Sequence, residues 1–348
     1  MLLTISIPTY QRAKYLDLCL QRIIFQISSD ITTEIEIIVS DNNSTDNTKE
    51  IVKKHIDNNP KINLKYFKND TNVGLDGNIT QAYRLANSRF VLVFGDDDVL
   101  IDGSIEKIYK ILSSNLDAGV VYIDSFGFTG DYREKIPVDN LGEYWKYFNK
   151  KSFIKKVNYY FTYTSGNIIN KSLIDSKLNV DRFLGTNLNL LNWIITGLFT
   201  AHYNIFISDR LIGTKTENTG GYGFCETFAK NGNYVFESFT KEDNIPAEYF
   251  DVINDRMIVN YLPYLINLFK ENSKSYIPEN YKELLTPIYK KNILYWLFCY
   301  PSIIFPRRVS GRFLYLNKWY RRFVNAKIKF IDETIDTKNG KLTKIKLN

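Results

Sequence analysis

Short apolar runs alternate with amphipathic stretches along the first hundred residues of the chain. Residues 2–8 and 34–40 are rich in Ile, and both end at turn-forming residues. Because each run is too short for a helix, the two predict buried parallel strands. Between them, the apolar positions of residues 15–26 recur at helical spacing and face one way, which predicts an amphipathic helix.

A second helix is predicted over residues 44–56. Ser44 and Thr45 are suited to cap its first turn, and Asp46 lies near the positive end of its dipole. The same periodicities predict a strand at 62–67, a helix at 78–88 and a strand at 90–94.

This alternation predicts an α/β fold with a doubly wound, mostly parallel sheet, in which ligands bind at the carboxyl ends of the strands. Three of the predicted strands end there in polar residues, namely Thr9 and Tyr10, Asp41 and Asn42, and Asp96 to Asp98. Further along, we expect strands at 119–125, 160–169 and 203–207, a glycine-rich loop at 218–225, and mainly helical structure over 241–320.

Composition indicates a globular protein, since 44% of the 348 residues are hydrophobic. A chain of this length can form one catalytic domain with a smaller appendage. Cys19, Cys225 and Cys299 are odd in number and far apart, which argues against a disulfide framework or a zinc ribbon and favours a reducing cytosol. The first residues lack the pattern of a signal peptide, so no export is expected.

The net charge of +7 is concentrated at one end of the chain. Residues 301–348 have a balance of +9, which leaves −2 for residues 1–300. Residues 293–305 are strongly apolar but too short to span a bilayer. We therefore expect peripheral contact of this region with an anionic membrane, the alternative being a core helix with a solvated basic tail. No nucleic-acid-binding motif accompanies the basic cluster, so no nucleic-acid partner is expected.

Three consecutive carboxylates, Asp96, Asp97 and Asp98, follow the strand predicted at 90–94. Like charges at this spacing repel one another, and a divalent cation relieves the repulsion. Mg²⁺ and Mn²⁺ bind through one or two carboxylates while substrate phosphates and water complete the shell. The run predicts a Mn²⁺ or Mg²⁺ site, with a solvated, helix-capping turn as the alternative.

No rival catalytic constellation is present in the sequence. His55 and His202 are the only histidines, which excludes an HExxH zinc site, and each is expected to be an ordinary surface or core residue. The GxxxxGK[ST] and GxGxxG phosphate-binding motifs are absent. Phosphate binding must therefore depend on the metal, and a sugar-nucleotide pyrophosphorylase, which needs a glycine-rich N-terminal loop, is not favoured.

Four motifs, in order, resemble glycosyltransferase family 2, which has the GT-A fold. Residues 6–12 (SIPTYQR) look like its first strand and nucleotide-binding loop, and residues 38–46 (IVSDNNSTD) look like its second-strand motif. Residues 72–78 (NVGLDGN) and 95–99 (GDDDV) are similar to its NxG segment and its metal motif. The resemblance covers about residues 3–102, and the Gly-Asp-Asp-Asp form is that of bacterial O-antigen and capsule sugar transferases.

The resemblance implies roles for individual residues. Within the donor pocket, Asp41 would accept a hydrogen bond from the base, most often uracil, and residues 72–78 would shape the floor beneath ribose and diphosphate. Ordinary turn chemistry is the alternative for each. The metal would be bound by Asp96, Asp97 and Asp98, and which two of them bind it is left open. The implied donor-binding residues are Pro8, Thr9, Tyr10, Arg12, Asp41, Asn72, Gly74, Asp76, Asn78 and Asp96.

The resemblance also implies how the chain is divided. A GT-A catalytic domain would occupy residues 1–240, with a nucleotide-sugar-binding half at 1–115 and an acceptor-binding half at 116–240. Residues 241–348 would form a helical, basic C-terminal region.

The distal half departs from the family. Members carry a Glu-Asp pair whose Asp takes the proton of the acceptor hydroxyl, whereas the matching stretch 185–190 (GTNLNL) has amides, which cannot act as a general base. Asp181 is predicted as the substitute base, with Asp124 and Asp209 behind it and a structural role open for each. The loop at 218–225 is expected either to close over the substrates or to be a plain surface loop.

These features predict an inverting, divalent-metal-dependent glycosyltransferase. The expected donor is a nucleotide-sugar, UDP-linked by resemblance, and the expected acceptor is a glycan or lipid-linked glycan of bacterial surface polysaccharide synthesis. The expected location is the cytoplasmic face of the cell membrane. The alternative, raised by the missing base, is a non-catalytic sugar-nucleotide-binding or scaffold protein of a glycan assembly complex.

Overall fold

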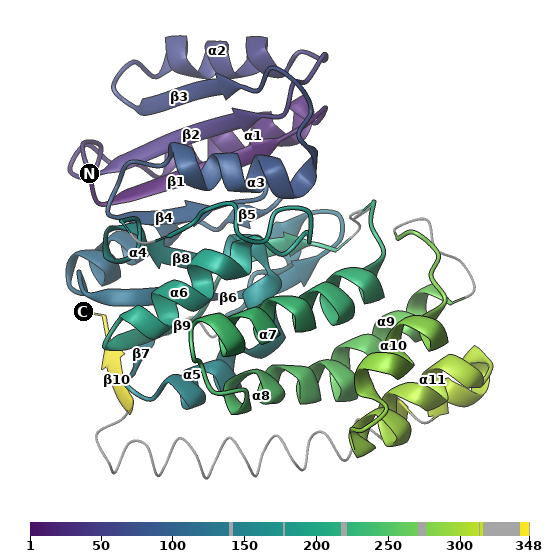
Figure 1. Cartoon of the computed structure of the whole chain (residues 1–348). Coiled ribbons are helices and arrows are strands. Elements are labelled where there is room, and N and C mark those ends of the chain that lie inside the picture. Colours follow the sequence, from purple (N-terminus) through teal and green to yellow (C-terminus); the bar gives the residue numbers. More distant parts are fainter. Residues whose placement is uncertain are drawn as a thin grey trace.

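The computed structural model of the chain describes residues 1–138, 142–176, 178–216, 221–270, 276–312, 314–315 and 342–347. One mixed sheet runs through it in the order β10-β7-β9-β6-β8-β4-β1-β2-β3, with β5 paired to β9 (Figure 1). The strands are β1 (Leu3–Thr9), β2 (Ile35–Asp41), β3 (Asn63–Lys68), β4 (Phe90–Val93), β5 (Val99–Leu100), β6 (Ala118–Phe128), β7 (Glu143–Tyr147), β8 (Asn167–Asn170), β9 (Tyr203–Lys215) and β10 (Leu342–Lys346).

Helices connect these strands and form most of the later chain. The α-helices are α1 (Ala13–Phe25), α2 (Thr48–Asn58), α3 (Gly74–Leu85), α4 (Ser104–Ser113), α5 (Lys150–Val157), α6 (Leu190–Thr200), α7 (Gly232–Glu242), α8 (Glu248–Arg256), α9 (Leu262–Phe269), α10 (Tyr281–Tyr289) and α11 (Tyr300–Ile304). Three π-helical segments, Glu226–Asn231, Met257–Tyr261 and Tyr295–Cys299, run directly into α7, α9 and α11.

The half of the sheet built from β3, β2, β1 and β4 is entirely parallel. All seven residues of β2 are buried, as expected of a parallel strand covered by helices on both faces. Beyond β4, β8 is antiparallel to both of its neighbours, and β6 and β9 pair in parallel. The predicted α/β fold with a helical C-terminal region is therefore confirmed, with antiparallel strands in the second half of the sheet.

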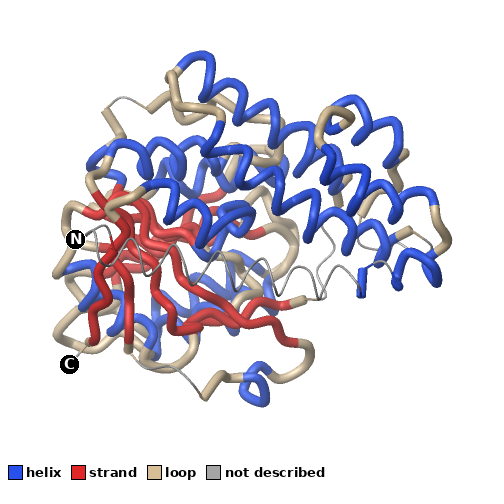
Figure 2. Tube along the Cα trace, turned by 90° about the horizontal axis from the view of Figure 1, so that it is seen from below, coloured by secondary structure: helices blue, strands red, loops and turns tan. Residues whose placement is uncertain are grey.

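Helices cover both faces of the sheet (Figure 2). Apolar side chains of α1, α2 and α4 form one core with the sheet, and those of α3, α5 and α6 form a second core that continues into the C-terminal helices. The fit of α6 on β6 requires a glycine, because a Cβ atom at Gly119 would lie 2.3 Å from the carbonyl oxygen of Gly197. The sheet is packed between these two cores, which hold its strands, and therefore the strand ends, in place.

Two local predictions are wrong. Ser44 and Thr45 do not cap α2, which begins at Thr48, because the carboxylate of Asp46 accepts the Thr48 N–H (3.2 Å) and hydroxyl (2.6 Å). The strand predicted at 160–169 is confined to β8, and 3₁₀ turns at Asn158–Thr162 and Thr164–Gly166 precede it. The side chain of Asn167 stabilises these turns by donating to the carbonyl groups of Phe161 (3.2 Å) and Tyr163 (2.7 Å).

The end of the chain was also predicted incorrectly as part of a helical region. Residues Leu342–Lys346 form β10, which pairs antiparallel with β7 (Figure 1). Lys344 of β10 forms an ion pair with Glu143 (2.6 Å). The described part of residues 241–312 is mainly helical, as predicted. The last strand therefore returns to the sheet, so the boundary predicted at residue 240 does not separate sheet from helices.

Candidate active site

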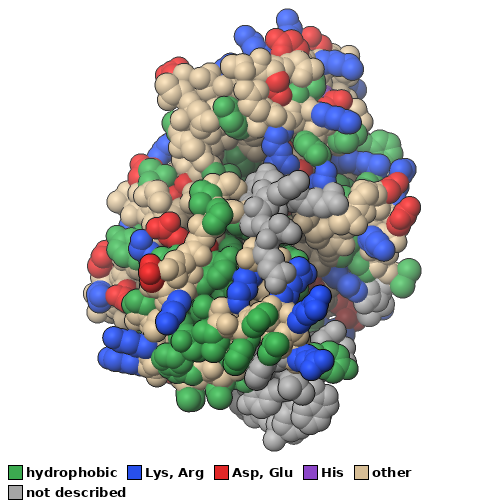
Figure 3. All heavy atoms as spheres, turned by 90° about the vertical axis from the view of Figure 1, so that its right-hand side faces the viewer, with side chains coloured by type: hydrophobic (Ala, Val, Ile, Leu, Met, Phe, Trp, Pro, Cys, Tyr) green, Lys and Arg blue, Asp and Glu red, His purple; other side chains and the backbone are tan. Residues whose placement is uncertain are grey.

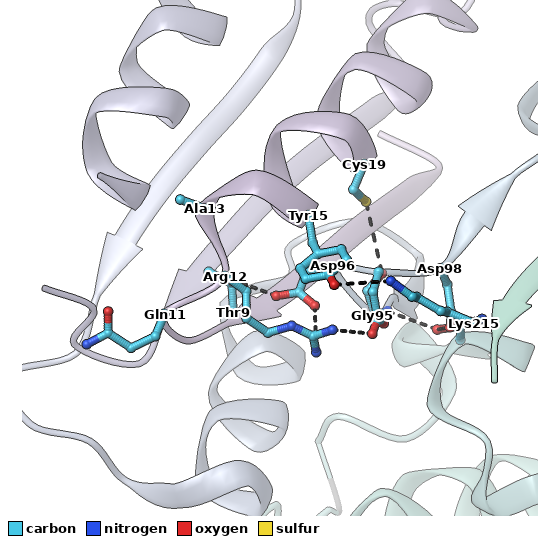
Figure 4. Close-up of polar contacts among 12 residues, drawn as sticks. Thr9, Gln11, Arg12, Ala13, Tyr15, Cys19, Gly95, Asp96, Asp98 and Lys215 are labelled. Carbon is cyan, nitrogen blue, oxygen red and sulfur yellow. Dashed lines mark hydrogen bonds and ion pairs between the residues drawn. The ribbon is translucent and has the colours of Figure 1, made fainter. Parts of the chain in front are cut away.

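The ends of two parallel neighbours, β1 and β4, assemble the first part of the site. The hydroxyl of Thr9 donates to Oδ2 of Asp96 (2.7 Å), in the loop after β4. Arg12, directly before α1, pairs with Oδ1 of Asp96 (3.1 Å) through Nη1 and with Asp97 through Nη2 (Figure 4). Residues from the β1 end thus hold the first two carboxylates of the acidic run.

The third carboxylate is held from the other half of the sheet. Oδ2 of Asp98 accepts hydrogen bonds from the hydroxyls of Tyr163 (2.8 Å) and Ser165 (2.6 Å), and Oδ1 accepts the backbone N–H of Lys215 (3.3 Å). Tyr163 in turn accepts a hydrogen bond from the hydroxyl of Thr214 (2.7 Å). The acidic run therefore lies at the junction of the two halves and is bonded to both.

Burial dominates the electrostatics of this run. It raises the pKa of Asp96 to about 7, although the charge of Arg12 and the hydroxyl of Thr9 act in the opposite direction. It also raises the pKa of Asp98 to about 6, against the lowering effect of the hydrogen bonds from Ser165 and Tyr163. The negative charge of the run is thus only partly compensated by its neighbours, and an added cation would stabilise it.

The acidic run fits the chemistry of a divalent ion without forming a complete ligand set. Among the residues that the structure describes, no three His, Cys, Asp or Glu side chains are arranged to hold a metal ion. Mg²⁺ is usually bound by one or two carboxylates and by substrate phosphates, so a partial set is sufficient when a diphosphate is present. The metal role of Asp96, Asp97 and Asp98 stays a prediction.

Amide side chains build a second wall, where α3 begins. Asn78 donates to the carbonyl oxygens of Ser40 (2.9 Å) and Thr9 (3.3 Å) and accepts the hydroxyl of Ser40 (2.8 Å). Asn42 donates to Asn72 (2.8 Å) and to the carbonyl of Gly74 (3.1 Å). These bonds fasten the start of α3 to the ends of β1 and β2.

Between these walls lies a cavity of about 530 Å³. It has the size expected of a small-molecule site. It brings together most of the predicted donor and metal residues, which are Pro8, Thr9, Tyr10, Arg12, Asn72, Gly74, Asn78, Asp96, Asp97 and Asp98. The remaining described lining residues were not among the individual residues predicted to bind the donor or the metal, and are Asn42, Leu75, Ile79, Gly95, Thr162, Tyr163, Thr164, Ser165, Thr214 and Tyr222.

Asp41 does not line this cavity, although it was predicted to bind the base. Its side chain is buried, with Oδ1 accepting the N–H of Ser44 (2.8 Å) and Oδ2 accepting the hydroxyl of Tyr66 (2.5 Å). Burial and the neighbouring carboxylate of Asp41 raise the pKa of Tyr66, so the phenol remains a donor. The carboxylate thus stabilises the turn after β2 in this structure.

Asp76, predicted to shape the floor beneath ribose and diphosphate, likewise points away from the cavity. Oδ2 accepts the backbone N–H groups of Gly185 (2.9 Å) and Asn187 (3.1 Å), and Oδ1 accepts that of Asn189 (3.1 Å). It therefore anchors the loop 185–189 to α3. This is the loop in which the family's base was expected.

Asp181 is not brought to the cavity. Its side chain is 51% exposed and pairs with Arg84 (2.6 Å) in the last turn of α3, whereas the cavity lies at the first turn. Asp209 is buried and accepts hydrogen bonds from Lys107 (3.0 Å) and from the N–H of Gly142 (3.0 Å). Neither position supports the role of a base, whereas Asp124 lines a second cavity, of about 510 Å³, that shares Tyr163 with the first.

Comparison with known proteins agrees with this geometry. Residues 4–176, about half of the chain, match the model of Glycosyl transferase family 2. The chain belongs to glycosyltransferase family 2. The match spans the acidic run, the amide wall and the 3₁₀ turns that hold Asp98. The family 2 fold thus accounts for both walls of the cavity.

Individual relatives match parts of this family 2 chain. Abequosyltransferase RfbV of Salmonella typhimurium is 37% identical over 117 residues, which are 34% of this chain and 34% of the relative. The GalNAc(5)-diNAcBac-PP-undecaprenol beta-1,3-glucosyltransferase of Campylobacter jejuni is 29% identical over 198 residues, covering 55% of this chain and 58% of the relative. The chain thus spans about a third and somewhat over half of these two proteins.

Among solved structures, S. aureus TarS 1-349 shares the fold with a TM-score of 0.60 at 17% identity, covering 92% of each chain. The same protein in complex with UDP-GlcNAc gives a TM-score of 0.57 at 18% identity, again over 92% of each chain. At these identities the likeness shows the fold alone, and it extends beyond the segment that the family model matches.

Proposed function

We propose that this protein is a glycosyltransferase that moves a sugar from a nucleotide-sugar to a glycan or lipid-linked glycan in bacterial surface polysaccharide synthesis. The observation that carries the proposal is the cavity at the ends of β1 and β4, which is lined by both the acidic run and the amide wall. The acidic groups suit a metal-bound diphosphate, and the size and polar lining of the cavity suit a nucleotide-sugar. A UDP-sugar is the first donor to test, because the resemblance in sequence implies uracil.

The proposed reaction is a direct displacement with inversion at the anomeric carbon. Arg12 is the one cation among the described residues that line the cavity, so it would bind the diphosphate and stabilise its charge as it leaves. A divalent ion held by the run Asp96–Asp98 would supply further positive charge at the same place. Tyr163 and Ser165 keep Asp98 in position, because both donate hydrogen bonds to its Oδ2 atom.

The test begins with donor turnover. The protein is incubated with Mn²⁺ and a panel of UDP-sugars, first alone and then with a crude lipid extract as acceptor, and the free UDP is measured. We expect slow release that is lost in Asp98→Asn and kept in Asp131→Asn, an exposed carboxylate that pairs with Arg133. UDP binding without turnover under all conditions would contradict the proposal and favour the non-catalytic scaffold.

The proposal includes contact with an anionic membrane at the cytoplasmic face. No helix among the described residues is long and apolar enough to cross a bilayer. On the face formed by the C-terminal helices, hydrophobic side chains gather together with Lys and Arg (Figure 3). Ile293 (66%), Trp296 (39%) and Leu297 (56%) are exposed at helical spacing, and the exposed side chains of Arg307 and Arg308 follow them. Of the predicted basic tail, residues 316–341 lie outside the described residues.

Cosedimentation with vesicles tests this contact. We expect binding to phosphatidylglycerol vesicles and much weaker binding to phosphatidylcholine vesicles, because exposed apolar side chains and cations act together. The double variant Ile293→Glu, Leu297→Glu should lose binding, whereas Phe25→Glu on α1, where Phe25 is 80% exposed, should retain it. Equal binding by both variants would exclude this surface as the contact.

A further inference from the structure

Tyr222 lies where two cavities meet. It lines the donor cavity and also the second cavity of about 510 Å³, as do Tyr163 and Thr214. Those two residues are joined by a hydrogen bond, and Tyr163 donates another to Asp98 (2.8 Å). Tyr222 therefore belongs to the side of the donor cavity that carries Asp98, and not to the amide wall at the start of α3.

The order of the strands indicates which part of a nucleotide-sugar would reach Tyr222. The amide wall lies at the ends of β1 and β2, and the acidic run follows β4. The turns that carry Tyr163 precede β8, which is the neighbour of β4 on the other side. A nucleotide-sugar has its diphosphate between the nucleoside and the sugar. With the diphosphate at the acidic run and the nucleoside at the amide wall, the sugar lies towards Tyr163 and Tyr222.

Residues 276–279, directly before α10, hold Tyr222 in place. The backbone N–H of Ile277 donates to the carbonyl oxygen of Tyr222 (3.1 Å). The ring of Tyr276 meets that of Tyr222 edge-to-face at a centroid distance of 5.5 Å, and the two side chains are also hydrogen-bonded. Tyr276 contacts Phe224 in the same way at 5.5 Å. Two segments that are far apart in the sequence are thus packed against each other.

Glu279 adds two hydrogen bonds to this contact. Its carboxylate accepts the backbone N–H groups of Cys225 (2.8 Å) and Glu226 (2.7 Å) through separate oxygens. These N–H groups lie at the start of the helical segment that continues into α7, where intrahelical acceptors are lacking and a negative charge is favourable. The carboxylate therefore fixes the chain just beyond Tyr222.

Gly223 makes this arrangement possible because it leaves room for Glu279. A Cβ atom at Gly223 would lie 2.5 Å from Oε1 and 2.8 Å from Cδ of Glu279. The carboxylate could move away from such an atom only by losing its bonds to Cys225 or Glu226. The described part of the loop expected at 218–225 therefore packs closely against the C-terminal region.

We propose that Tyr222 contacts the sugar of a bound nucleotide-sugar and that Glu279 is the positioning residue that keeps it there. This inference rests on the proposed transferase function. A tyrosine offers a sugar ring an apolar face and a hydroxyl group. Burial and the hydrogen bond with Tyr276 raise the pKa of Tyr222, so its phenol is neutral. Glu279 is not among the described residues that line either cavity, so it acts through Tyr222.

Calorimetric titration without acceptor separates the sugar from the nucleotide. Kd is measured with Mn²⁺ for UDP and for the UDP-sugar that wild type binds best. We expect Tyr222→Ala to weaken UDP-sugar binding about tenfold or more and to leave UDP binding within about threefold. Glu279→Ala should show the same selectivity with a loss of about fivefold, because the ring remains but is no longer held. Since Glu279 acts through Tyr222, the double variant should bind the UDP-sugar no more weakly than Tyr222→Ala alone.

Two further variants disturb the same contact in other ways. Gly223→Ala should reproduce Glu279→Ala because it displaces the carboxylate, whereas Glu279→Gln keeps one acceptor oxygen and should lose less. The controls Glu283→Ala on α10 and Tyr264→Ala on α9 alter exposed residues and should bind like wild type. Equal losses of UDP and UDP-sugar binding, or additive losses in the double variant, would overturn the assignment.

The failure of this inference can be told apart from that of the proposed function. If wild type binds a UDP-sugar and Tyr222→Ala binds it equally well, only the contact of Tyr222 with the sugar is overturned. If wild type binds none of the UDP-sugars, the proposed donor fails together with that contact. Hydrogen exchange then decides the role of Glu279 by itself. Glu279→Ala should speed amide exchange in peptides covering residues 222–226 about tenfold or more, and unchanged exchange would overturn the positioning role.

Discussion

Variants of Asp76 distinguish two roles for its carboxylate, which are donor binding and stabilisation of the fold. Its carboxylate accepts three backbone N–H groups from the loop 185–189 at 2.9–3.1 Å, and it does not line the donor cavity. Asp76→Ala would leave these three donors without their acceptor. Each unsatisfied buried donor costs about 1–3 kcal/mol, so we expect a loss of about 3–5 kcal/mol after partial solvation of the loop.

Asp76→Asn provides a graded comparison. An amide oxygen in the place of Oδ2 keeps the N–H groups of Gly185 and Asn187, whereas the NH₂ group in the place of Oδ1 opposes the N–H of Asn189. The expected loss is therefore about 1–3 kcal/mol, close to that of one hydrogen bond to a charged group. Burial raises the pKa of Asp76, so the wild type should gain stability relative to this variant as pH falls from 7 towards 4.

Urea denaturation gives the free energy of unfolding, and calorimetric titration gives Kd for UDP. If the carboxylate serves the fold, both variants lose stability while Kd stays within about threefold of wild type, that is, within about 0.7 kcal/mol. Asp181→Asn is the control, because its exposed ion pair should be worth less than about 1 kcal/mol. Unchanged stability together with a tenfold weaker Kd for UDP would refute the reasoning and support the predicted role of Asp76 in donor binding.

Three further outcomes are expected. Gly119→Ala should cost about 1–3 kcal/mol and lower Tm, because its Cβ would lie 2.3 Å from a carbonyl oxygen of α6, whereas Gly311→Ala, with no neighbour within 4 Å, should not lower it. Glu36→Gln should destabilise the protein at pH 7 but much less once the pH is below the pKa of Glu36 in the folded protein, as measured by urea denaturation. Burial acts to raise this pKa, but the hydrogen bonds from Lys65 and Thr4 outweigh it and lower the pKa, so the stability that the carboxylate contributes is lost as pH falls through the folded-state pKa. Arg12→Ala should weaken UDP binding about tenfold by calorimetry, since it removes about 1.4 kcal/mol of attraction to the diphosphate, and an unchanged Kd would contradict this role.

Most of the residues predicted to bind the donor line one cavity because strand order and motif order coincide there. Thr9 and Asp96 each follow a buried apolar strand, and the parallel pairing of β1 with β4 places their ends together. Asn78 lies one turn into α3, which begins at Gly74, four residues before the start of the predicted helix. These contacts depend on main-chain geometry, which apolar periodicity already determines.

Two residues predicted to bind the donor, Asp41 and Asp76, do not line the cavity, and the cause is the direction of the side chain. The carboxylate of Asp41 accepts a hydrogen bond from the hydroxyl of Tyr66 on the neighbouring strand β3. Asp76 is engaged by backbone N–H groups more than one hundred residues further along the chain. Neither partner forms a recognisable spacing with its carboxylate in the sequence. Tyr163 and Ser165 were not predicted as site residues. The segment that carries them was expected to be a strand, whereas it forms 3₁₀ turns that direct both hydroxyls to Asp98.

The hydrogen bonds of the acidic run connect the two halves of the sheet. Asp96 is held by the β1 end, and Asp98 is held by Tyr163 and Ser165 of the second half. Tyr163 also lines both cavities. A shift of the 3₁₀ turns would therefore alter the hydrogen bonds of Asp98, whereas a shift of the loop after β1 would alter that of Asp96. Because the two carboxylates are only two residues apart, we expect a change in the position of one to move the other as well.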